Sequence, residues 1–407
     1  MDGLVIGLDL CDAYAQINCG GKDKVWNLPT VICRKKNEDQ WFAGEDAYGA
    51  NLAGDGVIVD KLVSFARKNG TVAIGNTEYS GQELLQRFLK QVIALPGKEY
   101  RTERVNQMVI TLPSVDSRTM DCLLYCADYL EIPRNRFHVI SHSESFLYYV
   151  LSQKKEVWSS QVGLFDLSQN GLRYYEMKVQ RGLRQTTIVS DYEVLDEGMK
   201  LDRLDSASGA KQADKLLCAS GERLLAKKMF SSILLTGRGF DKPEWASDFM
   251  KLICRRRKVY GESNLFAKGA AYKAQDYLTE ETSFPYVMIC EGRLKATVSM
   301  EVLHDEKPTQ LVIAASGDSW YEAKSTMEFI LDRQNELVFQ IQPVDSRKKA
   351  EVRIPLEGFP SRPNRTTRIQ MKAGFVDERT MAIIIQDKGF GELYPASDAV
   401  IRREIAL

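Results

Sequence analysis

The chain has 407 residues, too many for one ordinary domain core, and 44% of them are hydrophobic and 27% charged, as is typical of globular proteins. Basic and acidic residues number 55 each, so no net field would attract nucleic acid or an anionic membrane. No apolar stretch approaches the length of a membrane span, and an acidic second residue followed at once by a strand excludes a normal signal peptide. We therefore expect a cytoplasmic protein of more than one domain, without membrane insertion or a nucleic-acid partner.

Two similar apolar runs, residues 5–10 and 163–167, each carry an aspartate close to turn-prone residues. Each run is typical of a strand covered on both faces, and the repeat predicts a duplicated α/β fold whose strand ends face one another across a cleft. The paired carboxylates of Asp9 and Asp166 would suit a hydrated Mg²⁺ and a phosphate chain. Taken singly, either aspartate could simply cap a turn.

Further elements follow in chain order. The pattern predicts buried strands at 27–32, 107–113, 137–141 and 231–236, a hairpin of strands at 171–179 and 183–190, and helices over 114–130, 211–229 and 264–271. Residues 41–47 read as a strand that leads into a helix start. The glycine and alanines of 264–271 would permit close helix approach.

These motifs, in this order, resemble the actin-like ATPase superfamily, and among its members most closely the 70-kDa heat-shock chaperones. Residues 7–10 resemble the first phosphate loop and 165–167 the second; 28–31 and 109–113 resemble the segments after the first hairpin and before the connecting helix; 234–239 and 268–271 resemble the two halves of the adenosine motif. The resemblance covers about residues 1 to 278 and is compatible with a divergent bacterial branch. It implies a ribonuclease H-like duplicated fold over residues 1–280, with a reduced upper subdomain, since only residues 171–231 separate the second loop from the adenosine motif.

The resemblance also implies roles for individual residues. Asp9 and Asp166 would hold the metal waters, Lys61 would approach the terminal phosphate, and His142 stands where the family has the carboxylate near the hydrolytic water. The remaining implied ligands are nucleotide contacts: Leu10, Cys11, Asp12, Ser168, Gln169 and Asn170 at the phosphates, and Gly237, Arg238, Gly239 and Lys268 at the adenosine. For Lys61 the alternative is a solvated side chain, and for the His142 region a helix cap made by Ser141 or Ser143 with Glu144.

Both phosphate loops depart from the family pattern. Residues 11–14 read Cys-Asp-Ala-Tyr and 168–170 read Ser-Gln-Asn where the family has glycines and hydroxyl residues. Glycine suits such a loop because a phosphate oxygen approaches the backbone closely. Asp12 adds a negative charge beside any phosphate. We therefore expect weak binding of ATP or ADP with Mg²⁺ and at most a slow Mg-dependent ATPase.

Beyond the polar residues 279–283, alternating runs replace the mixed pattern, notably at 296–302, 327–331, 337–342, 367–371 and 381–385. They predict a β-sandwich over residues 284–407, whose final part, 367–391 with a hairpin turn at 377–380, resembles the end of the chaperone substrate-binding domain. The family's aliphatic linker and helical lid have no counterpart, since only residues 397–407 follow. The run 311–313 is the expected edge for strand addition by a partner segment.

Eight cysteines, without a C-x-x-C pair, and three scattered histidines give no metal or hydrolase constellation, so we expect buried, reduced thiols. The combined expectation is a chaperone-like or adaptor protein that binds a protein or peptide partner, with weak nucleotide binding in the cleft. The alternative is a non-hydrolysing actin-like fold that serves as a scaffold or filament component.

Overall fold

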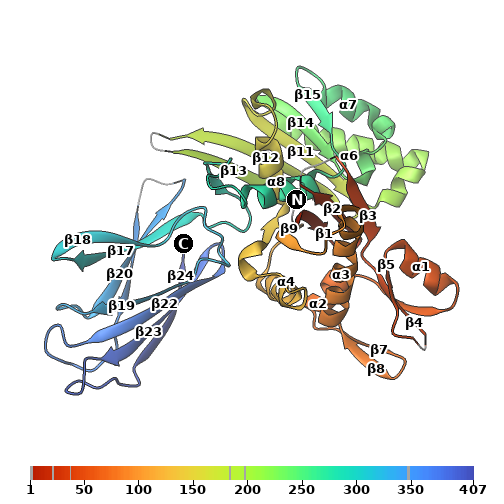
Figure 1. The fold of residues 1–407 in the computed structure, drawn as a ribbon. Coiled ribbons are helices and arrows are strands. Elements are labelled where there is room, and N and C mark those ends of the chain that lie inside the picture. The colour runs from red at the N-terminus through yellow and green to blue at the C-terminus, as the bar shows by residue number, and fades with distance from the viewer. Residues whose placement is uncertain (1–2, 21–22, 37, 183–184, 197–198, 346–348) are drawn as a thin grey trace. The chain divides into compact units, whose positions relative to one another are not determined.

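The computed structural model describes residues 3–20, 23–36, 38–182, 185–196, 199–345 and 349–407 (Figure 1). Its contacts divide the chain into two compact units, Met1–Tyr286 and Val287–Leu407. The first unit mixes helices and sheets, and the second is built from strands. The mixed α/β character predicted for the first part and the strand-rich second part are therefore confirmed.

The first sheet of the first unit has the strand order β10-β9-β1-β2-β3. β1 to β3 form an antiparallel meander, whereas β9 lies parallel to β1 and β10 parallel to β9. The strands are β1 (Leu4–Leu10), β2 (Tyr14–Cys19), β3 (Val25–Pro29), β9 (Val105–Leu112) and β10 (Phe137–Ser141).

A second sheet of the first unit repeats this pattern. Its strands run in the order β15-β14-β11-β12-β13. Again the first three in sequence form an antiparallel meander and the last two are parallel additions beside β11. The strands are β11 (Gln161–Ser168), β12 (Gly171–Arg181), β13 (Thr186–Asp196), β14 (Phe230–Thr236) and β15 (Lys258–Gly261). The two similar runs of the sequence thus hold the same central position in two sheets of the same strand order.

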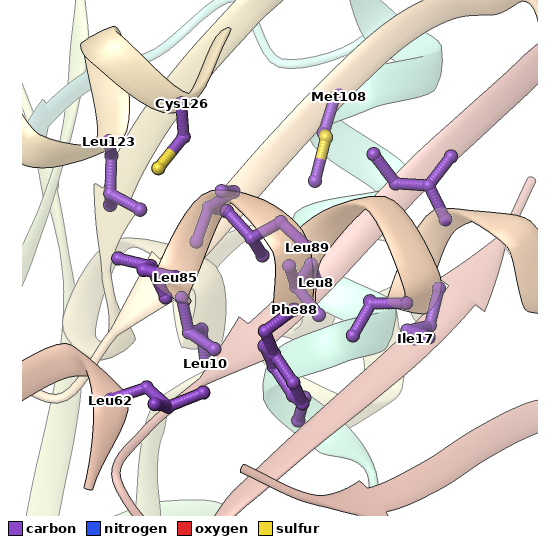
Figure 2. Packing of buried hydrophobic residues seen from close by; sticks show 14 of the residues in the cluster. Leu8, Leu10, Ile17, Leu62, Leu85, Phe88, Leu89, Met108, Leu123 and Cys126 are labelled. Carbon is purple, nitrogen blue, oxygen red and sulfur yellow. The ribbon is translucent and has the colours of Figure 1, made fainter. Parts of the chain in front are cut away.

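Helix α3 (Gly81–Tyr100) carries the apolar face that covers the first sheet. Ser80 caps it through the amide of Glu83, and the Glu83 carboxylate accepts the Ser80 amide in return, which completes a capping box. Figure 2 shows Leu85, Phe88 and Leu89 of this helix among buried side chains of β1, β2 and α4 (Ser117–Tyr129). The elements that flank this core are β4 (Ile32–Lys35), β5 (Trp41–Ala43), α1 (Glu45–Leu52), β6 (Gly56–Val59), α2 (Leu62–Arg67), β7 (Thr71–Ile74) and β8 (Thr77–Ser80).

Helix α8 (Leu265–Asp276) lies directly on β1 and on α5 (His142–Leu151). A Cβ atom added at Gly7 would collide with backbone atoms of Ala267 and Ala271, and one added at Gly269 would collide with the Ser145 carbonyl. Ala267, Ala270 and Ala271 are fully buried. The small residues of the sequence therefore do permit the close approach that was predicted.

The second sheet has its own core with α6 (Ala207–Leu225) and α7 (Ser247–Ile253). Asp214 of α6 accepts the amides of Asp248 and Phe249, which fixes α7 onto α6. The predicted helix over 211–229 is displaced, because the chain must reach β14 at Phe230 and therefore leaves the helix at Leu225. Of the predicted hairpin, β13 begins at Thr186, and residues 183–184 lie outside the described part.

The second unit contains two four-stranded sheets, ordered β18-β17-β20-β21 and β19-β22-β23-β24. Buried side chains of both sheets form one cluster that includes Phe339 and Met371, an arrangement typical of a β-sandwich. The strands of these two sheets are β17 (Ala296–His304), β18 (Lys307–Ala314), β19 (Ser325–Ile330), β20 (Glu336–Pro343), β21 (Ala350–Pro355), β22 (Arg368–Asp377), β23 (Thr380–Gly389) and β24 (Val400–Ala406). The short strand β16 (Val287–Ile289) precedes them and belongs to neither sheet.

The edge strand, the hairpin turn and the last residues of the second unit can be compared with the prediction. Residues 311–313 lie in β18, at an edge of its sheet, and Asp377 pairs with Thr380 across the predicted hairpin turn. Residues 397–407 also contribute to the sandwich, because β24 pairs with β23 and completes the sheet β19-β22-β23-β24.

The polar segment 279–283 is held to the end of α8. Asp276, a buried side chain, accepts hydrogen bonds from the Thr282 hydroxyl and the Ser283 amide and pairs with Lys273 at 3.1 Å. The buried carboxylate of Asp276 thus fixes the path of the polar residues 279–283.

Among the described residues, no helix has the length and apolarity needed to cross a bilayer. Cys33 and Cys126 are buried, as predicted for the thiols, but Cys254 is exposed because it lies in the turn after α7.

Candidate functional site

The two aspartates hold equivalent places in the two sheets. Asp9 of β1 lies opposite Thr111 of β9 in the parallel ladder, and Asp166 of β11 lies opposite Thr236 of β14. Both threonines are buried. The side chains therefore emerge at the same edge of each sheet, just before a hairpin turn.

The hairpin turns after the aspartates have the same length. Cys11 donates its amide to the Tyr14 carbonyl at 3.0 Å, and Ser168 pairs with Gly171 across the second turn. In each turn the first side chain also accepts a hydrogen bond from a backbone amide. Cys11 Sγ accepts the Tyr14 amide at 3.4 Å, and Ser168 Oγ accepts the Asn170 amide at 3.3 Å. The amides of Tyr14 and Asn170 are therefore used within the turns.

His142 joins this site from the first turn of α5. Its Nε2 atom lies 2.7 Å from Asp9 Oδ1, and its ring stacks on Phe266 of α8 with centroids 3.8 Å apart. The residue is 3% exposed, and its Nδ1 atom has no hydrogen-bond partner among the described residues. Ser141 caps the helix through the amide of Glu144, as the predicted cap requires, and this cap fixes where His142 enters the site.

Asp166 is the most deeply placed carboxyl group of the site. Burial raises its pKa to about 7, an electrostatic interaction with His142 opposes this shift, and the negative charge of Asp9 adds to it. Ser168 Oγ lies 3.5 Å from Asp166 Oδ2. Because the charge of Asp9 helps to raise the pKa of Asp166, the two carboxyl groups interact electrostatically.

The two turns are bridged by side chains. Arg238 donates to the Tyr14 hydroxyl and lies over its ring, with the guanidinium carbon 3.6 Å from the ring centroid. Gln169 donates to the same hydroxyl at 3.4 Å. The pKa of Cys11 is raised to about 11 by burial and by Asp9, although a hydrogen bond with the Asn170 side chain lowers it. The first turn is thereby fastened to residues of the second sheet.

Three predicted residues have other surroundings. Asp12 accepts the Ser64 amide at 2.9 Å and the Ser64 hydroxyl, so its carboxylate is occupied by the first turn of α2. Leu10 is fully buried in the core of the first sheet. Lys61 is exposed at the residue before α2, with φ 52°.

The residues of the predicted adenosine motif serve the local packing. Gly237 has φ 86°, and a Cβ atom there would collide with the Leu167 carbonyl and crowd Asp166; a Cβ atom at Gly239 would collide with the Leu167 side chain. Lys268 donates to Glu262 at 2.7 Å, and both side chains are largely buried. The two glycines are therefore explained by the approach of this loop to the end of β11, and Lys268 by its ion pair.

This donor set can be compared with what a magnesium nucleotide needs. Among the described residues, no group of three or more His, Cys, Asp or Glu side chains could hold a metal ion. Asp9 and Asp166 fit a cation only through water. The amides of Tyr14 and Asn170 in the two turns and the guanidinium of Arg238 already have partners within the protein. The residues fit a phosphate chain poorly.

Sequence reasoning missed Tyr14 and Phe266, which complete the site. Tyr14 follows the first turn directly, and a bulky residue there, where small hydroxyl residues were expected, was the available signal. Nothing in the sequence marked Phe266 as a site residue, because an aromatic residue in a buried helix most often belongs to the hydrophobic core.

Comparison with known proteins identifies two regions. Residues 293–407 match a domain of unknown function (DUF8552). No curated protein matched the chain. Residues 13–291, more than half of the chain, match the C-terminal part of a family of unknown function (DUF5716), and the protein therefore belongs to that family.

Proposed function

We propose that the first unit is an actin-like domain of the ribonuclease H-like, duplicated kind, followed by a chaperone-like β-sandwich. Two sheets with the same order and strand directions, central strands that each carry an aspartate near their end, and the close packing of α8 on β1 support this architecture.

On this architecture we propose that the protein works in the cytoplasm as an adaptor that binds a protein partner, and that its cleft does not hydrolyse ATP. The bridge from Arg238 and Gln169 to Tyr14 carries this proposal. The bridge places a tyrosine and a paired guanidinium between turns that in an ATPase must admit phosphates. Any nucleotide would have to break these contacts first, which subtracts from its affinity.

His142 supports the same conclusion. A hydrolytic water needs an accessible acceptor, but His142 Nε2 already interacts with Asp9, and the Nδ1 atom is buried in a ring that stacks against Phe266. Glu144 lies further into α5, where its amide takes part in the helix cap. No described carboxylate takes the place predicted for the water-orienting group.

The deciding experiment combines calorimetry with an ATPase assay. We expect no measurable heat with Mg-ATP or Mg-ADP at submillimolar concentration and phosphate release no faster in wild type than in Asp166→Ala. The double variant Tyr14→Ala with Arg238→Ala, which removes the bridge, should bind no worse than wild type. Steady turnover by wild type that disappears in Asp166→Ala would overturn the proposal.

The equivalent positions of Asp9 and Asp166 in the two sheets support a second candidate function, weak binding of Mg-ADP without hydrolysis. In that case millimolar Mg-ADP raises the melting temperature of wild type by mass action, and Asp9→Ala abolishes the rise. ADP with EDTA is the matched control, since only the metal-dependent mode uses the carboxylates.

A further inference from the structure

A cluster of basic residues lines two adjoining cavities at the end of the second sheet opposite Asp166. The larger cavity, of about 820 Å³, is lined by Lys155, Arg256, Arg257 and Lys258 and by one acidic residue, Glu156. The smaller, of about 410 Å³, is lined by Arg181 and Lys178, and the two share Ser159. We call this region the basic groove.

Most cations of the basic groove are not neutralised. Among the described residues, Lys155, Arg181, Arg256, Arg257 and Lys258 take part in no ion pair, whereas Lys178 is paired with Glu176 at 3.1 Å. The two cavities adjoin at Ser159, so Lys155 of one and Arg181 of the other belong to one surface. Burial and the charge of Arg181 lower the pKa of Lys155. In a chain with no net charge, this concentration of positive charge is local.

Apolar groups lie beside these cations. Met229 is 82% exposed although it directly precedes Phe230, which lines the larger cavity. Its backbone is held in place, because its carbonyl accepts the Ser160 hydroxyl at 2.6 Å. The Lys155 ammonium lies 3.2 Å from the centroid of the Trp158 ring. The surface therefore offers fixed positive charge together with an exposed thioether side chain.

We propose that the basic groove binds an acidic segment of a protein partner in which carboxylates alternate with apolar side chains. The cations extend over two cavities instead of converging on one point, so they suit a chain of separate carboxylates better than a single phosphate. The apolar neighbours suit leucine-like side chains. This inference rests on the proposed adaptor role for the partner being a protein, but the binding it describes does not depend on the cleft.

The test uses the full chain and a fluorescein-labelled peptide of aspartate, glutamate and leucine. Fluorescence anisotropy should show saturable binding that weakens with sodium chloride. A peptide with asparagine and glutamine in place of the acids should not bind. Arg256→Glu combined with Lys258→Glu should weaken binding roughly tenfold or more. The matched control is Arg402→Glu with Arg403→Glu, an equal charge change on exposed residues of β24, which should leave binding unchanged.

Several outcomes would overturn the inference. They are absence of binding by wild type, equal weakening by both double variants, and tighter binding of a labelled single-stranded oligonucleotide than of the peptide. If the charge-reversed variant fails to fold by circular dichroism, Lys155→Gln with Lys258→Gln must give the loss instead. Detection of ATP turnover would overturn the proposed function but would not affect the peptide-binding result. Peptide binding to the basic groove is measured without nucleotide and therefore tests the inference independently.

Discussion

The guanidinium of Arg238 covers the ring of Tyr14, although 224 positions separate the two residues in the chain. The contact connects the turn after β1 with the loop after β14, so it joins the two sheets of the first unit at the aspartates. The contribution of this contact to the free energy of unfolding can be measured directly.

Arg238→Ala should lower the free energy of unfolding of the first unit by about 1–2 kcal/mol, because it removes a cation–π contact and a hydrogen bond. Tyr14→Phe keeps the ring and loses only the hydroxyl, so it should cost about half as much. Urea denaturation followed by tryptophan fluorescence gives both values. Lys251→Ala, which breaks an exposed ion pair with Asp248, is the control and should change stability by less than about 0.5 kcal/mol. Equal effects of Arg238→Ala and Lys251→Ala would show that the bridge contributes nothing.

Asp166 should make the first unit less stable as the pH rises. Its folded pKa, about 7, lies above the ordinary value of 3.8, so the unfolded state ionises first. Stability is then full below pH 3.8, declines through the interval up to about 7 and is flat above it, with a total loss on the order of 4 kcal/mol. Asp166→Asn should therefore be more stable than wild type at pH 8.

The dependence of stability on pH can also be tested with a variant of His142. His142→Gln removes the imidazole that opposes the rise in the pKa of Asp166, so the decline should extend to higher pH than in wild type. The measurement is the free energy of unfolding in urea from pH 5 to 9. A wild type that gains stability across this interval relative to Asp166→Asn would contradict the assignment.

Gly7→Ala should destabilise the first unit by about 3 kcal/mol or more, since the added methyl group meets the backbone of α8, which cannot move without displacing β1. Gly49→Ala is the matched control. No atom lies within 4 Å of a Cβ at Gly49 in α1, and the exchange should stabilise by about 0.5–1 kcal/mol. Thermal melting by circular dichroism distinguishes the two signs.

Arg362→Ala should destabilise the second unit by about 3–5 kcal/mol, because it leaves the carboxylate of Asp387 buried without its bidentate partner. Burial opposes ionisation of Asp387, but Arg362, the Gly389 amide and Ser397 together hold its pKa well below the ordinary value. The contribution of the pair is therefore present at neutral pH and is lost as the pH falls below 3.8. Arg353→Ala, at an exposed pair with Glu336, should cost less than about 1 kcal/mol in the same urea titration.

Local pattern was enough to predict most strands. The single strand predicted at 27–32 was wrong, because β3 ends at Pro29 and Ile32 begins β4 in a different sheet. The runs around Asp9 and Asp166 are apolar throughout because both faces of each central strand are covered, and this is visible without the structure. Helix α3 was equally readable, since Ser80 and Glu83 form a capping box before an apolar period, yet it did not enter the prediction.

The surroundings of the site residues were not predictable in this way. Asp12 was assigned to a phosphate loop, but its partner Ser64 lies 52 positions away and no periodicity connects them. The same holds for His142 and Asp9, which are 133 positions apart. Such pairs depend on how β1, α5 and α2 meet, and this is decided by tertiary packing, which spacing in the sequence does not encode.

The absence of a side-chain layer between α8 and β1 has a consequence for hydrogen exchange. Where Gly7 meets the backbone of Ala267 and Ala271, no rotamer change can open a path for water, and the helix amides there can exchange only when the sheet itself separates from the helix. The amide protons of α8 near Ala271 should consequently be among the slowest of the first unit, and their exchange rate would report its global opening.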